Sequence, residues 1–292
     1  MVVDILKITW VALGLVLAMV LASVGLRVVE RYAFPVWEPN YFNERPGRVG
    51  PYEVSESDAI NNKSIEGERY EISLFAPKGE NNQVPGFIWL TGSNVQPYYH
   101  QSLHETLASW GYLVIVPEVP PFSFTDLSYH KDILSLASEA VSMAISGELG
   151  VEVAEDRIAA GGYSTGASLA AFLGAKRSEI AGLVYWAPSG SPYWLGLSSD
   201  KLYPEVDQPA LYVLGELDNS APPVGEYPEK MQKLMPKSPV TIEVIEKGVH
   251  HYFQQPTGAD KFSADTEITR FEQQGKAIDS TRKWLNNLFG PN

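Results

Sequence analysis

The sequence of 292 residues contains no cysteine and comparatively few basic side chains. The missing thiols exclude disulfides, thiolate metal sites and a cysteine nucleophile, and their absence fits either redox compartment. Lys and Arg number 22 against 35 Asp and Glu, so the formal net charge is −13. Because such a surface repels a phosphate backbone, we expect no nucleic-acid partner.

The sequence also lacks internal repeats and a glycine-rich phosphate loop. Without such a loop after a strand, we expect no nucleotide cofactor. His100 and His104 are spaced to share one helix face, as metal ligands can be, but no third ligand stands near them. We therefore expect no metal site and assign the two histidines to a surface helix.

One long apolar run stands apart at the N-terminus, where residues 8–26 carry no charge. As a helix this run is about 28 Å long, close to the hydrocarbon thickness of a bilayer. We predict that residues 1–31 form a single-pass membrane anchor; a cleaved signal peptide and a buried helix are the alternatives. The basic residues after the run favour a cytoplasmic domain. An N-terminal signal-like segment usually exports the domain behind it, and we expect the domain on the exported side.

The rest of the chain divides into a linker and one domain. Residues 32–66 are rich in Pro, Gly and Asn without a sustained period, which indicates a linker. From residue 67 to 292, strand-like and helix-like segments alternate, and hydrophobic residues make up 45% of the chain. This pattern predicts an α/β fold with a mostly parallel sheet flanked by helices. The strand-like segments are 69–77, 86–92, 112–118, 157–164, 180–188, 209–218 and 240–248, and the helix-like ones are 98–111, 126–149, 167–176, 224–236 and 268–289.

The stretch "GGYSTGAS" places Ser164 in a Gly-x-Ser-x-Gly motif between a strand-like and a helix-like segment. In such a turn, side chains at Gly162 and Gly166 would collide with the neighbouring strand and helix. The turn raises the serine hydroxyl above the sheet edge, and the helix N-terminus offers N–H groups to an oxyanion. The motif therefore indicates a catalytic serine, although small-residue turns of this kind also arise by chance.

A serine nucleophile needs a base and a group that orients the base. Asp218 follows the strand-like "PALYVLG", with Glu216 nearby, and His250 and His251 follow "VTIEVIEKG". The order Ser, acid, His is expected when each residue stands at the carboxyl end of a successive parallel strand. Asp218 could equally cap a turn, and the two histidines could be ordinary loop residues.

Taken together, "GFIWLTGSN", "SWGYLVIVPEVP", "DRIAAGGYSTGAS", "LYVLGELD" and "KGVHHYF" resemble the α/β-hydrolase superfamily over about residues 68–289. The resemblance is strongest to compact esterases related to dienelactone hydrolases and platelet-activating-factor acetylhydrolases. It implies a catalytic triad of Ser164, Asp218 and His250, the histidine being favoured by the Gly-x-His-x-x-Phe spacing. It also implies an oxyanion hole built from the N–H groups of Ser93 and Thr165, although this chain lacks the His-Gly that many relatives carry there.

The resemblance implies a serine hydrolase that cleaves a small-molecule or lipid-like carboxylic ester through an acyl-enzyme. An amidase or thioesterase would use the same residues, and a non-catalytic hydrolase-fold binding module on a membrane is the rival from another class. The chain between Ser164 and Asp218 is too short for a helix, a strand and a separate lid domain as well. Tyr98, Tyr99, Trp186 and Trp194 could form an aromatic wall at the site or pack in the core.

Overall fold

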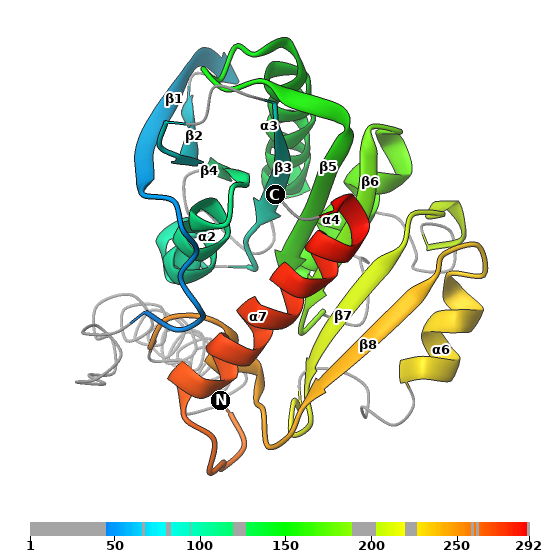
Figure 1. Ribbon diagram of the computed structural model, residues 1–292. Helices are drawn as coiled ribbons and strands as arrows, with labels where there is room; N and C mark the ends of the chain where they lie inside the picture. Colours follow the sequence, from blue (N-terminus) through cyan, green and yellow to red (C-terminus); the bar gives the residue numbers. More distant parts are fainter. Residues whose placement is uncertain are drawn as a thin grey trace, which may run out of the picture.

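The computed structural model describes residues 45–65, 68–79, 83–93, 95–118, 127–188, 203–219, 227–257, 260 and 263–290 (Figure 1). The predicted anchor at residues 8–26 lies outside these ranges. Within the described ranges, no helix combines the length and the apolar character needed to cross a membrane.

A single sheet of eight strands forms the centre of the fold, in the order β1-β2-β4-β3-β5-β6-β7-β8. The strands β1 and β2, and β2 and β4, pair antiparallel, and all other neighbours are parallel. The sheet is therefore mostly parallel, as expected. The strands are β1 (Val54–Ile65), β2 (Glu68–Pro77), β3 (Val84–Leu90), β4 (Leu113–Glu118), β5 (Val153–Tyr163), β6 (Ile180–Trp186), β7 (Ala210–Gly215) and β8 (Val240–Ile245).

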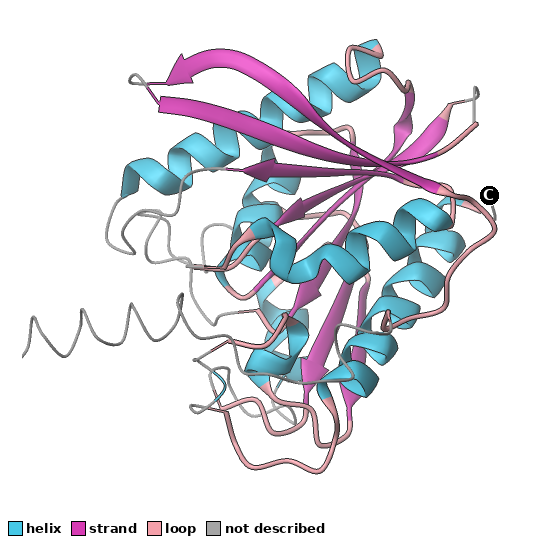
Figure 2. Cartoon of the chain, turned by 90° about the vertical axis from the view of Figure 1, so that its left-hand side faces the viewer, coloured by secondary structure: helices cyan, strands magenta, loops and turns pink. Residues whose placement is uncertain are grey.

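Helices cover both faces of the twisted sheet (Figure 2). The helices α3 and α4 pack on one face, and α2 and α7 pack on the other (Figure 1). The α-helices of the described residues are α2 (Gln101–Ser109), α3 (Leu127–Ser146), α4 (Thr165–Lys176), α6 (Tyr227–Leu234) and α7 (Arg270–Phe289). The same part of the chain contains the short 3₁₀ helices η1 (Pro97–His100), η3 (Tyr203–Glu205) and η5 (His250–Phe253).

The strands β3 and β7 are apolar because both of their faces are buried. All residues of β3 and β7 are buried. In β4, Leu113 and Ile115 belong to the core under α3 and α4, whereas Val114 and Val116 belong to the core under α2 and α7. This two-residue alternation between two cores explains why these strands appear in the sequence as unbroken hydrophobic runs.

The outermost strand, β1, was not expected. Its residues 54–65 fall in the segment that we assigned to the linker, but they pair antiparallel with β2 from Val54 opposite Pro77 to Ile65 opposite Glu68. An edge strand is held by backbone hydrogen bonds to one neighbour and needs no continuous apolar pattern. The polar sequence "VSESDAINNKSI" therefore gave no hydrophobic signal of a strand.

Candidate active site

Ser164 forms the sharp turn between β5 and α4. Its backbone angles, φ 54° and ψ −116°, lie in a region that residues with a side chain rarely adopt. A Cβ atom at Gly162 would lie 2.3 Å from the carbonyl carbon of Gly166, and one at Gly166 would lie 2.1 Å from the Leu90 carbonyl oxygen. The close approach of α4 requires glycine at 162 and that of β3 requires it at 166, as the motif predicted.

The loop after β3 lies directly against this turn. A Cβ atom at Gly92 would come within 3.2 Å of the Ser164 Cβ and 3.1 Å of the Tyr163 carbonyl oxygen. The hydroxyls of Ser93 and Thr165 form a hydrogen bond of 2.9 Å. Thr165 is the first residue of α4, so its N–H has no acceptor within the helix. The structure therefore brings the two predicted oxyanion-hole residues into contact beside Ser164.

Asp218 follows β7 in a tight turn. Its N–H donates to the Gly215 carbonyl at 3.1 Å, and the N–H of Leu217 donates to the Gly248 carbonyl at 2.8 Å. The second bond ties the turn to the segment that carries His250. The carboxylate is thus held near the end of β8, the next strand along the sheet.

His250 and Asp218 form a buried hydrogen-bonded pair. The Nδ1 atom of His250 lies 2.8 Å from Oδ2 of Asp218, and the two side chains are 7% and 3% exposed. A carboxylate can only accept, so the proton of this hydrogen bond is on Nδ1, and in the neutral form of such an imidazole Nε2 is the acceptor. The other candidate acid, Glu216, is exposed and accepts a hydrogen bond of 2.8 Å from the Lys247 N–H. Asp218, and not Glu216, is therefore the carboxylate that is bonded to this histidine.

Tyr163, the residue before Ser164, holds His250 beside the turn. Its hydroxyl donates to the His250 carbonyl at 3.2 Å, and the two ring centroids are 5.1 Å apart. Among the described residues, the Ser164 hydroxyl and His250 are not joined by a hydrogen bond. His251 is half-buried, and its carbonyl accepts a hydrogen bond of 2.6 Å from Arg270.

Gln273 and Arg270 on α7 contact the same segment and were not predicted. The amide of Gln273 bonds both backbone groups of Val249, and Arg270 donates to the carbonyls of His251 and Gln254. Both side chains are buried. A buried arginine beside a histidine-bearing turn leaves no signal in a helix pattern, because its role depends on how the helix packs.

His100 and His104 are buried, which corrects their assignment to a surface helix. They are 2% and 1% exposed, and their rings pack against Trp89, Tyr163 and Phe75. Burial lowers the pKa of His100 to about 3 and that of His104 well below its usual value. Both are therefore neutral core residues. On α2, His104 shares its face with Leu103, Leu107 and Ala108, so the buried stripe simply includes the histidine.

The aromatic residues that could form a wall at the site differ in how exposed their side chains are. Tyr98 is 54% exposed, whereas Tyr99 and Trp186 are buried in the core under α2 and α7. The Trp186 indole N–H donates to the Thr281 hydroxyl at 2.9 Å. Trp194 lies outside the described residues. Trp186 is thus a core residue, while Tyr98 remains available at the surface.

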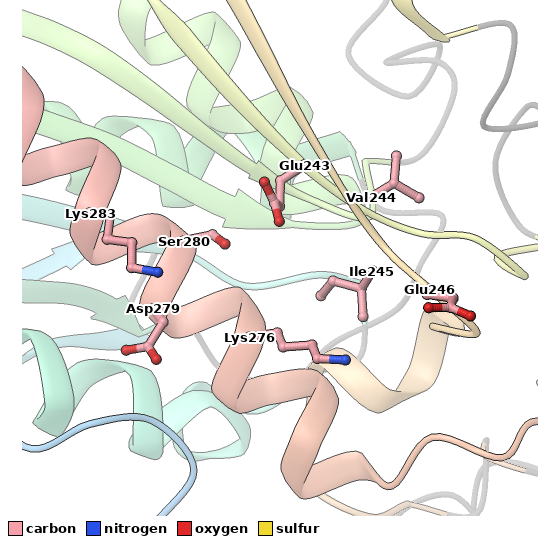
Figure 3. A pocket seen from close by; sticks show the side chains of 8 residues that line it. All are labelled: Glu243, Val244, Ile245, Glu246, Lys276, Asp279, Ser280 and Lys283. Carbon is pink, nitrogen blue, oxygen red and sulfur yellow. The ribbon is translucent and has the colours of Figure 1, made fainter.

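A surface groove of about 320 Å³ lies between β8 and α7 and does not include the predicted site residues (Figure 3). Figure 3 shows the side chains of Glu243 and Glu246 on the strand side and of Lys276, Asp279 and Lys283 on the helix. None of Ser164, Asp218 and His250 lines it, so it is separate from the candidate site. In the described part of the chain, no three acidic or histidine side chains gather as a metal site.

No protein-family model and no curated protein matches the sequence of this chain. Solved structures with the same architecture are nevertheless found by comparison of the structures. Esterase 2 of Thermogutta terrifontis, solved after phosphorylation by paraoxon, superposes with a TM-score of 0.62 at 16% identity, over 86% of this chain and 99% of that chain. A Klebsiella pneumoniae protein described as a dienelactone hydrolase gives 0.60 at 16% identity, over 80% and 98%. An esterase of Rhizomucor miehei gives 0.57 at 15% identity, over 82% and 85%.

This chain has the α/β-hydrolase fold. The resemblance inferred from the sequence is therefore confirmed at the level of the fold, which includes the mostly parallel sheet and the flanking helices. In an α/β-hydrolase fold, the carboxyl ends of the strands form the edge where a site is assembled. Ser164, Asp218 and His250 follow β5, β7 and β8 at that edge.

Proposed function

We propose that the protein is a serine hydrolase that cleaves carboxylic esters through an acyl-enzyme. Ser164 is the nucleophile, His250 the general base and Asp218 the carboxylate that orients the base. The N–H groups of Ser93 and Thr165 form the oxyanion hole. The substrate is a small-molecule or lipid-like ester, and no cofactor takes part.

The buried hydrogen bond between Asp218 and His250 is the observation that carries this proposal. It pairs the two residues that a serine nucleophile requires, at the sheet edge where Ser164 stands in a strained turn. The absent Ser164–His250 hydrogen bond is compatible with this role, since catalytic hydrogen bonds are often long before substrate binds. A strained backbone that is maintained by two obligatory glycines also supports a functional serine.

The reaction follows from these roles. His250 Nε2 accepts the hydroxyl proton as Ser164 Oγ attacks the ester carbonyl, and the oxyanion is stabilised by the two N–H groups. The same imidazole, now protonated, gives its proton to the leaving alcohol. Water then attacks the acyl-enzyme with His250 again as base, which releases the acid and restores Ser164. Throughout, Asp218 keeps Nδ1 protonated and stabilises the imidazolium.

The structural neighbours add support from their own chemistry. Two of them are esterases, and one of these esterases was solved after phosphorylation by paraoxon. An organophosphorus reagent is therefore a suitable probe for this chain.

We further propose that residues 8–26 tether the domain to a membrane, with the domain on the exported side. Retention of the full chain in carbonate-washed membranes tests the tether, whereas a mature chain starting after the run would indicate a signal peptide.

Labelling with a fluorophosphonate tests the catalytic assignment. We expect a single covalent adduct on Ser164 in the wild-type protein, and hydrolysis of at least one activated ester from a panel of acyl chain lengths. Ser164→Ala should remove the adduct and lower turnover by about 10⁴-fold or more. An adduct that persists in Ser164→Ala would reject Ser164 as the nucleophile. Faster cleavage of matched amides or thioesters would reassign the substrate class.

A further inference from the structure

Val249, the residue before His250, is held through both of its backbone hydrogen-bonding groups by one side chain. Its N–H donates to Oε1 of Gln273 at 2.9 Å, and its carbonyl accepts from Nε2 of Gln273 at 2.7 Å. The side-chain amide thus pairs with Val249 as a neighbouring strand would. Val249 and Gln273 are both 0% exposed, so water cannot replace either bond.

The packing of α7 fixes the position of the Gln273 side-chain amide. Further along α7, Ala277, Ile278 and Leu285 are buried in the core under α2 and α7. Thr269 caps the helix N-terminus by accepting from the Glu272 N–H at 3.1 Å. The position of Gln273 is therefore set by the packing of the whole helix against the sheet.

The held carbonyl belongs to the peptide unit that leads into His250. That unit is planar, so fixing the Val249 carbonyl also fixes the direction of the His250 N–H and limits where its Cα–Cβ bond can point. Two other contacts act on His250 itself: Asp218 bonds its ring and Tyr163 bonds its carbonyl. The Gln273 contact acts on the backbone on the side from which the histidine enters the turn, directly after the Gly248 carbonyl that accepts from the Leu217 N–H.

We propose that Gln273 is a positioning residue that orients His250 by holding both backbone groups of Val249. This inference rests on the proposed function, since it assigns Gln273 a role in setting the geometry of the general base. Gln273 acts through the backbone and takes no part in proton transfer. Its loss should therefore lower the rate of acylation more than substrate affinity.

Arg270 keeps the far end of the same turn in place. Its guanidinium donates to the carbonyls of His251 and Gln254, each at 2.6 Å, pairs with Asp260 and stacks over the Tyr252 ring. These contacts do not involve Gln273. A change at Gln273 should consequently alter the entry into the turn and leave the rest of η5 folded.

The first test is Gln273→Leu in the full-length protein, which removes both hydrogen bonds. We expect fluorophosphonate labelling to slow by about 100-fold, as expected when a reacting group is displaced by about 1 Å. With an activated ester, kcat should fall by a similar factor while KM changes little. The low-field proton resonance of the Asp218–His250 hydrogen bond should shift or broaden. The measurement of this resonance does not depend on enzymatic activity.

The second test is Gln273→Glu, which keeps the shape of the side chain. A neutral glutamic acid can accept from the Val249 N–H and donate to its carbonyl, whereas the ionised form cannot donate. Burial favours the neutral form. The labelling rate of this variant should therefore fall as pH rises through the ionisation of the new carboxyl group, a descending arm absent from the wild-type profile.

The matched control is Ile278→Ala, a core truncation on the buried face of the same helix. It should lower stability yet leave labelling within about threefold of wild type at temperatures where the protein is folded. Equal labelling rates for Gln273→Leu and Ile278→Ala, with an unchanged proton resonance, would overturn the proposal. If Gln273→Leu does not fold, a wild-type pH profile for Gln273→Glu would overturn it instead. A wild-type protein that neither labels nor cleaves esters would reject the proposed function, while the proton resonance still decides the role of Gln273.

Discussion

Gly166 in α4 faces the carbonyl oxygen of Leu90 so closely that a Cβ atom would come within 2.1 Å of it. The oxygen belongs to the backbone of β3, at the centre of the sheet, and cannot move aside without disturbing the strand. This contact sets the distance between the turn at Ser164 and the loop at Gly92. The geometry of the candidate oxyanion hole therefore depends on a hydrogen atom at position 166.

Gly166→Ala should destabilise the protein for this reason. We expect the free energy of unfolding to fall by about 3 kcal/mol, the upper part of the usual range for overpacking. Gly275 in α7 is a control, because among the described residues outside its own helix backbone a Cβ atom there would meet only the Gly47 nitrogen, at 3.4 Å. Gly275→Ala should raise stability by up to about 1 kcal/mol through helix propensity. Urea unfolding measures both, and equal effects would contradict the steric argument.

Asp218→Asn should separate the two acidic candidates. An asparagine keeps the shape but favours the wrong imidazole tautomer, so turnover should fall by about 10⁴-fold with folding nearly intact. Glu216→Gln is the comparison, since its amide oxygen can still accept from the Lys247 N–H. That variant should retain most activity. Steady-state rates with an activated ester measure both, and the reverse ranking would move the acid to Glu216.

The adjacent histidines should differ strongly when replaced. His250→Ala removes the partner of Asp218 and should lower acylation as far as Ser164→Ala does, because members of a triad act as a unit. His251→Ala should cost much less, since the bond from Arg270 reaches the His251 backbone carbonyl and survives the change. Pre-steady-state release of the alcohol product gives the acylation rate. An inactive His251→Ala beside an active His250→Ala would reverse the assignment.

Acid should destabilise the protein through His100 and His104. Burial lowers the pKa of His100 from 6.5 to about 3, so the unfolded chain binds a proton that the folded protein does not. With respect to this histidine, the free energy of unfolding is therefore highest above about pH 6.5 and declines as pH falls from 6.5 towards 3. At pH 5 the loss is about 2 kcal/mol for such a histidine.

His100→Phe should abolish that part of the acid sensitivity, because phenylalanine suits the aromatic surroundings of Trp89 and Tyr163 and does not titrate. The measurement is the free energy of unfolding at pH 5 and pH 7.5 for both proteins. A difference between the two pH values that is the same in wild type and variant would show that His100 is already protonated in the fold.

The central strands and the order of the candidate site residues along the chain could be predicted because their signals are local. Unbroken apolar runs marked β3 and β7, and the glycines around Ser164 marked the turn. Asp218 was predicted as a candidate from its place directly after a strand. Adjacent His250 and His251 could be ranked only by spacing to Phe253, and the hydrogen bond to Asp218 supplies the missing geometric reason.

The remaining features depend on contacts between distant segments. The β1 strand is held by backbone pairing, so its polar sequence resembles a linker. Nothing in the spacing of His104 shows which face of α2 turns inward. The bonds between Gln273 and Val249 join residues 24 positions apart and form only when α7 docks on the sheet.

The attachment of the His250 segment to α7 has a consequence for the order of events during translation. Domains generally begin to fold from the N-terminal side as the chain is synthesised. The strands of the sheet, Ser164 and Asp218 all precede α7 in the chain, so they leave the ribosome before Gln273 and Arg270. Under the proposed function, a nascent chain would thus carry Ser164 without an oriented His250, and the proposed ester cleavage would begin only after the helix had emerged and docked.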